Sequence, residues 1–168
     1  MNIPGLILQM ISAIAGLGTL FMAWLALKSW RHQLIAQANL DVARRLRLAA
    51  HRVLGEIQDC RYGISQENYG ARLRCLRELT AELDSAATEA ASLWDIPVED
   101  RVNDLYLHVA EFRTGVAHRF GDGWTDLPPE RQVAISSIVH GDESDPFAKR
   151  LAQAVKALDA LTIQYIKL

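Results

Sequence analysis

The stretch Val98–Phe120, VEDRVNDLYLHVAEFRTGVAHRF, decides the fold of this chain. Apolar residues spaced by three or four positions line one face of an α-helix, whereas a half-buried strand would alternate every second residue. We therefore expect a long amphipathic helix here, with its apolar stripe facing the core of an all-α domain. The stripe consists of Val98, Val102, Leu105, Val109, Phe112, Val116 and Phe120.

The same periodicity recurs on both sides of this stretch. Turn signals separate the periodic segments: Tyr62-Gly63-Ile64, Asp95-Ile96-Pro97 and Gly121-Asp122-Gly123. Ser65 and Asp145 are expected to cap the helices that follow them, since short polar side chains accept hydrogen bonds from free backbone N–H groups. No alternating strand pattern is found. Helices are expected over 28–61, 66–94, 98–120, 129–139 and 146–165.

The segment from Ile3 to Leu27 is uncharged and mostly apolar. Its length of about 25 residues corresponds to roughly 37 Å as a helix, more than the ~30 Å of a bilayer core. A cleaved signal peptide is the first alternative, but no basic residue precedes the run, which continues past Ala15. A buried helix of a soluble protein would seldom stay uncharged for so long. We expect a single transmembrane helix.

The flanks of this segment set its orientation. Only three residues precede Pro4, whereas Lys28, Arg31 and Arg44 follow the apolar run. The positive-inside rule then places the N-terminus outside and the C-terminal body in the cytoplasm. The expected organisation is a transmembrane helix over 1–27, a basic helical stem over 28–61 and a cytoplasmic helical bundle over 62–168. A basic stem next to a membrane attracts anionic lipid, and RNA is an alternative partner.

Small and uncharged polar residues gather on one face of the apolar segment, at a repeat of 3.5 residues. A monomeric anchor needs no such sorting, whereas small residues allow helices to approach closely and polar ones are tolerated against another helix or water. We therefore expect a homo-oligomer, packed shut with few subunits or enclosing a lumen with many. A plain anchor with a few tolerated polar residues is the alternative. The face begins with Gly5, Gln9, Ser12, Gly16 and Thr19 and continues with Ala23, Ala26 and Trp30.

Metal and cofactor chemistry have no support in the residue spacing. No two histidines are separated by three residues, no glycine-rich phosphate loop follows a strand, and no CxxC occurs. Cys60 and Cys75 are expected to be reduced structural thiols. The run His140–Asp145, HGDESD, is expected to be a solvated turn that ends in a helix cap. We expect no metal and no cofactor.

One pattern has the residues of a catalytic pair. Arg113 and His118, in EFRTGVAHRF, resemble the R-x(4-6)-H motif of HEPN domains, helical bundles that often act as metal-independent ribonucleases. An imidazole moves a proton during attack by the RNA 2′-hydroxyl while a guanidinium binds the phosphate. The motif is also matched by Arg44 and Arg45 with His51 and by Arg101 with His108, so catalysis, binding or assembly, and plain solvated surface all stay open. Arg113 is expected on the flank of the apolar stripe and His118 nearly opposite it.

The whole architecture resembles the small membrane accessory proteins of type VI-B CRISPR systems. That resemblance implies a bacterial inner-membrane protein with a HEPN-like bundle, an RNA-guided nuclease or RNA as partner, and a ring-shaped pore that supports antiviral defence. At residue level it rests on Arg113 and His118 alone. Two alternatives stay open: a membrane-tethered HEPN-like ribonuclease, and a membrane-anchored helical adaptor that docks another protein.

Overall fold

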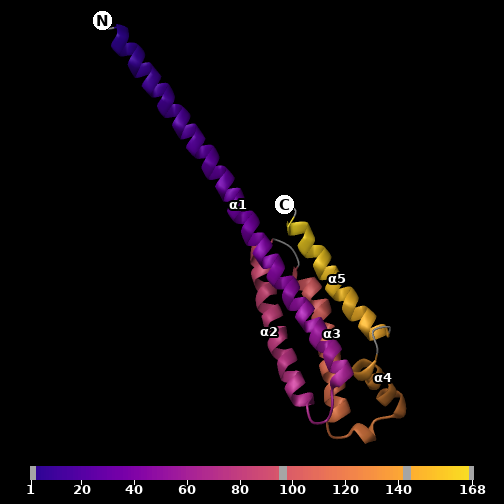
Figure 1. Ribbon diagram of the computed structural model, residues 1–168. Helices are drawn as coiled ribbons and strands as arrows, with labels where there is room; N and C mark the ends of the chain where they lie inside the picture. Colours follow the sequence, from indigo (N-terminus) through magenta and orange to yellow (C-terminus); the bar gives the residue numbers. More distant parts are fainter. Residues whose placement is uncertain (1–2, 95–97, 142–144, 167–168) are drawn as a thin grey trace. The chain divides into compact units, whose positions relative to one another are not determined.

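The computed structural model describes the backbone of residues 3–94, 98–141 and 145–166, with side chains from Ala15 onward. Among these residues the chain is entirely helical and contains no strand, which confirms the all-α expectation (Figure 1). The elements are α1 (Ile3–Gly63), α2 (Tyr69–Leu93), α3 (Val98–Phe120), the short 3-10 helix η1 (Trp124–Asp126), α4 (Pro129–His140) and α5 (Pro146–Ile166).

The chain divides into two compact units, Met1–Ala38 and Asn39–Leu168. Helix α1 begins in the first unit and ends in the second, so both expected domain boundaries, after residues 27 and 61, fall within it. An apolar stripe with the same three- and four-residue steps runs along the stem from Ile35, and it is buried from Val42 to Ile57. Ile35, which belongs to the same stripe but to the first unit, is 57% exposed. Residues 39–61 therefore contribute a face to the core of the second unit.

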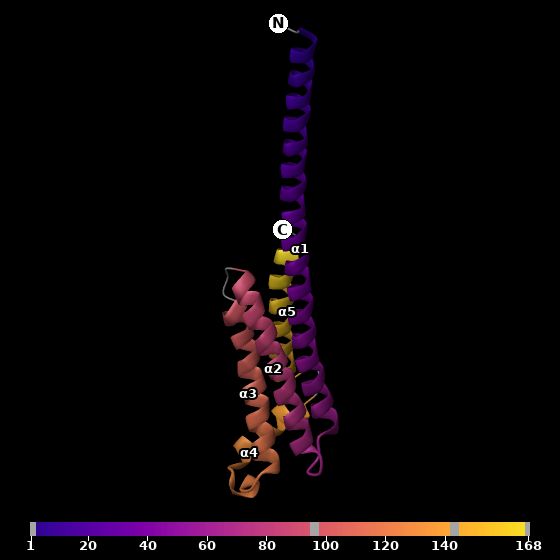
Figure 2. The ribbon, with the colours of Figure 1, turned by 90° about the vertical axis from the view of Figure 1, so that its left-hand side faces the viewer.

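Helix α3 supplies the centre of that core. It packs against α2, α4 and α5, and its stripe is buried as the periodicity predicts, with Phe120 half-buried at the end. Helix α4 lies at the end of the bundle where α1 terminates, in both views (Figures 1 and 2). The other fully buried large side chains include Leu46, Val53 and Ile57 of α1, Leu76 and Leu83 of α2, and Leu151, Val155 and Leu158 of α5.

The helix ends differ from the sequence expectation at one turn. Asn68, rather than Ser65, occupies the N-cap position of α2. The Asn68 side chain donates to the Gly63 carbonyl at 2.9 Å and accepts from the Ser65 backbone N–H at 2.7 Å. An asparagine amide has a separate donor and acceptor on a longer side chain than the serine hydroxyl. The Asn68 amide can therefore bond to both Gly63 and Ser65. The start of α5 follows the expectation, because the Asp145 carboxylate accepts from the Ala148 N–H at 2.8 Å.

A buried ion pair joins α1 to the start of α5. The Arg61 guanidinium is bonded to the Asp145 carboxylate, and also donates to the Ser137 carbonyl at 2.9 Å. Its carbon lies 5.2 Å from the centre of the Phe147 ring, a cation–π distance. The Arg61 side chain is only 3% exposed. Gly141 lies directly beside this pair, and a Cβ at that position would overlap both charged side chains and the Ser137 carbonyl.

Candidate functional site

Two of the five predicted assembly residues, Gly16 and Thr19, lie in the part of α1 whose side chains are described. Gly5, Gln9 and Ser12 lie outside it. A Cβ added at Gly16 would meet nothing within 4 Å, so the chain itself does not require glycine there. The Thr19 hydroxyl donates to the Ala15 carbonyl at 2.8 Å, one turn earlier in the same helix. Both residues are exposed in the single chain.

Large apolar side chains of the same unit are exposed. Leu17 is 68% exposed, Leu20 69% and Phe21 59%. Among the residues with described side chains, which begin at Ala15, no helix contains a stretch both long and apolar enough to cross a membrane. The segment expected to span the membrane, from Ile3 to Leu27, lies partly outside those residues.

The structure does not bring Arg113 and His118 together on one surface of the chain. Both belong to α3, where five residues correspond to about 140° around the helix axis. Arg113 is half-buried and lines a groove between α2 and α3, whereas His118 is exposed and is not among the residues that line it. A general-base mechanism with this pair would therefore need the histidine or the arginine of a second chain.

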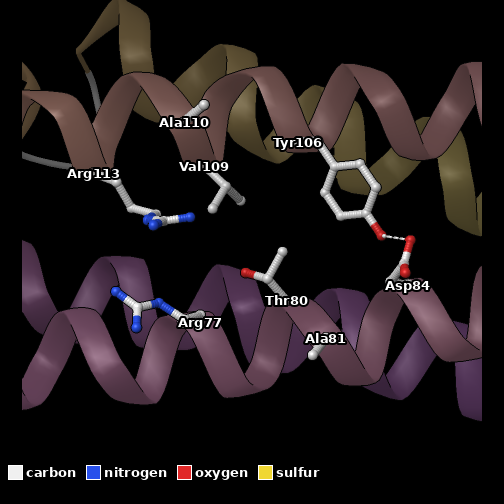
Figure 3. Close-up of a pocket in the computed structure, with 8 residues that line it drawn as sticks. All are labelled: Arg77, Thr80, Ala81, Asp84, Tyr106, Val109, Ala110 and Arg113. Carbon is white, nitrogen blue, oxygen red and sulfur yellow. Dashed lines mark hydrogen bonds between the residues drawn. The ribbon is translucent and has the colours of Figure 1, made fainter.

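The groove that receives Arg113 lies between α2 and α3 (Figure 3). Its larger hollow has a volume of about 430 Å³, and a neighbouring hollow shares Arg77, Ala110 and Arg113 with it. The space exists because both helices present small side chains, Ala81 on α2 and Ala110 on α3. Figure 3 shows the Arg113 guanidinium in the gap between the two helices and the exposed Arg77 side chain lying along α2, with its guanidinium at the same end of the groove.

The charges of the groove are unequal at its two ends. Within the described part of the chain, neither Arg77 nor Arg113 forms a hydrogen bond or an ion pair, so the end they occupy is positive. At the other end the Tyr106 hydroxyl donates to the Asp84 carboxylate at 3.1 Å. Burial, and then the bond to Asp84, raise the pKa of Tyr106, so its phenol keeps its proton at all physiological pH values.

Another polar cluster connects α1 to α5. Arg47 Nε donates to one oxygen of Asp159 at 3.0 Å, and His51 Nε2 lies 2.9 Å from the other. The carboxylate is thus shared by two side chains of α1, one turn apart, and holds the helices in register. No group of three or more potential metal-ligating side chains, whether histidine, cysteine or carboxylate, occurs among the described residues.

Sequence reasoning identified Arg113 but missed Arg77 and the Asp84–Tyr106 pair. Their positions in the sequence, relative to the connection between the two helices, could have indicated them. Arg77 and Arg113 are equally far from Asp95 in opposite directions along the chain, and so are Asp84 and Tyr106. Two helices joined by a short connection run antiparallel, which brings such residues opposite one another. The pairing of Arg113 with Arg77 becomes visible only when the two helices are aligned antiparallel, because neither helix alone contains both residues.

Comparisons with known proteins add no relative. None of the family models, curated proteins or solved structures compared with this chain matches it significantly. Two features of this chain bear on its function: the face of α1 that carries Gly16 and Thr19, and the groove between α2 and α3.

Proposed function

We propose that this chain is a membrane-anchored, homo-oligomeric accessory or effector protein of prokaryotic antiviral defence, which acts by forming a pore that depolarises the cell. The N-terminal helix crosses the bacterial inner membrane, with the N-terminus outside and the helical bundle in the cytoplasm. The partners are membrane lipid, further copies of the chain and, following the resemblance to type VI-B CRISPR accessory proteins, an RNA-guided nuclease or its RNA.

The observation that carries the proposal is the division of one helix into two unlike faces. Gly16 and Thr19 lie on the face of small and uncharged polar residues, whereas Leu17, Phe21 and Leu25 lie on the face of bulky apolar ones. Helices associate in lipid through small residues, because these let the backbones approach and gain van der Waals contact. A helix that only tethered the bundle would have no reason to separate its residues in this way.

The local structure of this face supports contact with something outside the chain. Open space surrounds Gly16, so its missing side chain serves no neighbour in its own fold. The Thr19 hydroxyl is satisfied by the Ala15 carbonyl, and therefore needs no water or partner when it is placed in an apolar environment. At Thr19, therefore, the face can be buried against another helix without leaving the hydroxyl unsatisfied.

Two glycines of the same turn provide a matched pair of variants. Gly16 lies on the small-residue face, and Gly18 lies about 200° around the helix, on the bulky face. A Cβ at either position meets nothing within 4 Å. Gly16→Leu and Gly18→Leu therefore add the same apolar side chain to the same helix, and each is expected to leave the fold of the chain intact.

The assays are the mass of the detergent-solubilised protein and the membrane potential of cells that express it, read with a voltage-sensitive dye. We expect Gly16→Leu to reduce both oligomer mass and depolarisation, because the leucine holds neighbouring helices apart, and Gly18→Leu to match the wild type. Equal behaviour of the two variants, or a monomeric wild-type protein, would contradict the proposal. Cleavage of RNA by the pure protein, lost in His118→Ala, would instead support the ribonuclease alternative.

A further inference from the structure

The two arginines of the α2–α3 groove differ from most interhelical arginines of this bundle. Arg45, Arg52 and Arg72 each pair with a carboxylate on a neighbouring helix. Arg77 and Arg113 face the same groove from opposite sides and have no such carboxylate among the described residues. Two like charges beside one hollow repel each other, and an anion bound between them would relieve that repulsion.

The chemistry of two guanidiniums favours phosphate over carboxylate. Each guanidinium presents a planar fork of donors that binds two acceptor oxygens at once. One such fork uses both oxygens of a carboxylate, whereas the terminal phosphate of a monoester has three oxygens and a charge near −2. Arg77 on α2 and Arg113 on α3 can therefore share one phosphate, each through its own fork.

The opposite end of the groove indicates what the rest of the ligand carries. Asp84 and Tyr106 lie seven residues from Arg77 and Arg113 on their respective helices, or about 10 Å along the helix axes. The Asp84 carboxylate is exposed and has one oxygen not used by Tyr106, so it can accept a hydrogen bond from a hydroxyl or amino group. The same negative charge disfavours a continuous polyanion along the groove.

The wall between the two ends is apolar or small. It is formed by Thr80 and Ala81 of α2 and by Val109 and Ala110 of α3. These side chains offer a surface for a flat or apolar body and no further charge. The groove thus presents, in order, two cations, an apolar wall and a hydrogen-bond acceptor, a sequence of groups that matches a small phosphomonoester such as a nucleoside monophosphate.

We propose that the α2–α3 groove is a binding site for a small phosphomonoester, whose phosphate lies between Arg77 and Arg113 and whose hydroxyl-bearing or amino-bearing body extends towards Asp84. The site is separate from the face of α1 that the proposed function uses, and it does not include His118. Arg113 accordingly acts with Arg77 across the groove and not with the histidine of its own helix.

The test measures binding of adenosine 5′-monophosphate to the full chain in detergent by isothermal titration calorimetry, with adenosine and inorganic phosphate as partial probes. Arg77→Gln and Arg113→Gln are each expected to weaken binding of the nucleotide roughly tenfold or more, because each removes charge-assisted hydrogen bonds. Asp84→Asn is expected to weaken the nucleotide but to leave inorganic phosphate unchanged or tighter. Adenosine is expected to bind far more weakly than the nucleotide.

Two variants control for general effects. Arg131→Gln removes the same charge from an exposed arginine on α4, outside the groove, and His118→Ala removes the histidine of the R-x4-H motif. Both are expected to bind the nucleotide as the wild type does. Circular dichroism melting of each variant separates loss of binding from loss of folding.

Three results would overturn the proposal. The first is the absence of measurable binding of both the nucleotide and inorganic phosphate at millimolar concentration. The second is an equal loss of affinity in Arg131→Gln, which would mean that binding follows net charge alone. The third is tight binding of a short single-stranded RNA through Arg77 and Arg113 with no binding of the mononucleotide, which would assign the groove to a nucleic-acid strand.

Discussion

Replacing Asp145 by asparagine is expected to destabilise the bundle strongly, although the change keeps the shape of the side chain. The new amide would retain an oxygen that can accept from the Ala148 N–H, and so preserve the cap of α5. The substitution would remove the negative charge that balances Arg61, whose side chain is 3% exposed. The guanidinium would then be buried without its carboxylate.

The magnitude follows from that burial. Removing one partner of a buried ion pair costs about 3–5 kcal/mol, and the lower end applies here because Asp145 is itself 15% exposed and asparagine still offers an acceptor. We expect a loss of about 3 kcal/mol in the free energy of unfolding, or roughly 10 °C in Tm for a unit of this size. Asp145→Ala, which also removes the cap, is expected to cost about 1 kcal/mol more.

The assay is urea unfolding of each variant followed by circular dichroism, with Glu82→Gln as the matched control. Glu82 pairs with Arg52 on the surface, where the side chains are 54% and 53% exposed, and its loss is expected to cost less than about 1 kcal/mol. Combining Arg61→Met with Asp145→Asn is expected to cost less than the sum of the two single changes. If Asp145→Asn is no more destabilising than Glu82→Gln, the buried pair does not stabilise the bundle as argued.

Three further predictions concern Gly141, His140 and Cys60. Gly141→Ala is expected to lower the free energy of unfolding in urea by about 2 kcal/mol, because the new methyl group would overlap the buried Arg61–Asp145 pair. Gly55→Ala, which has open space in α1, is expected to raise it by up to about 1 kcal/mol. Equal effects of the two substitutions would refute the contact at Gly141. Burial, and then Arg119, lower the pKa of His140, so the unfolded chain binds a proton below about pH 6.5 before the folded chain does. Stability is therefore expected to fall as the pH drops below about 6.5, less steeply in His140→Gln, and identical pH profiles of Tm would contradict this assignment. Burial raises the pKa of the Cys60 thiol to about 12, so iodoacetamide at pH 8 is expected to modify it only after denaturation, and rapid labelling of the native protein by mass spectrometry would show otherwise.

The helices and their buried faces could be predicted where the spacing of apolar residues alone determines burial. The stripe of α3 is apolar at steps of three and four, and it is buried as that spacing requires. The stripe of α1 obeys the same rule, yet Val42 is buried and Ile35 is exposed. Periodicity identifies which face of a helix is apolar, but it does not state where along the helix a covering partner begins.

The candidate groove illustrates a second limit. Arg113 could be placed on the flank of its stripe from the helical repeat, but its importance comes from Arg77 across the gap and from the lack of a nearby carboxylate among the described residues. Whether an arginine finds a carboxylate depends on side chains of another helix, which periodicity does not pair. The antiparallel numbering about Asp95 supplies that pairing once both helices are known.

The hydrogen bond from Thr19 to the Ala15 carbonyl bears on how reversible the proposed assembly would be. A hydroxyl that had to exchange water for a partner on a neighbouring helix would make each subunit's entry and exit a rearrangement of hydrogen bonds. The acceptor of the Thr19 hydroxyl lies in the same helix, so this hydrogen bond can stay the same whether lipid, protein or water surrounds the residue. In the proposed assembly, a subunit could then join or leave without breaking a polar contact at Thr19.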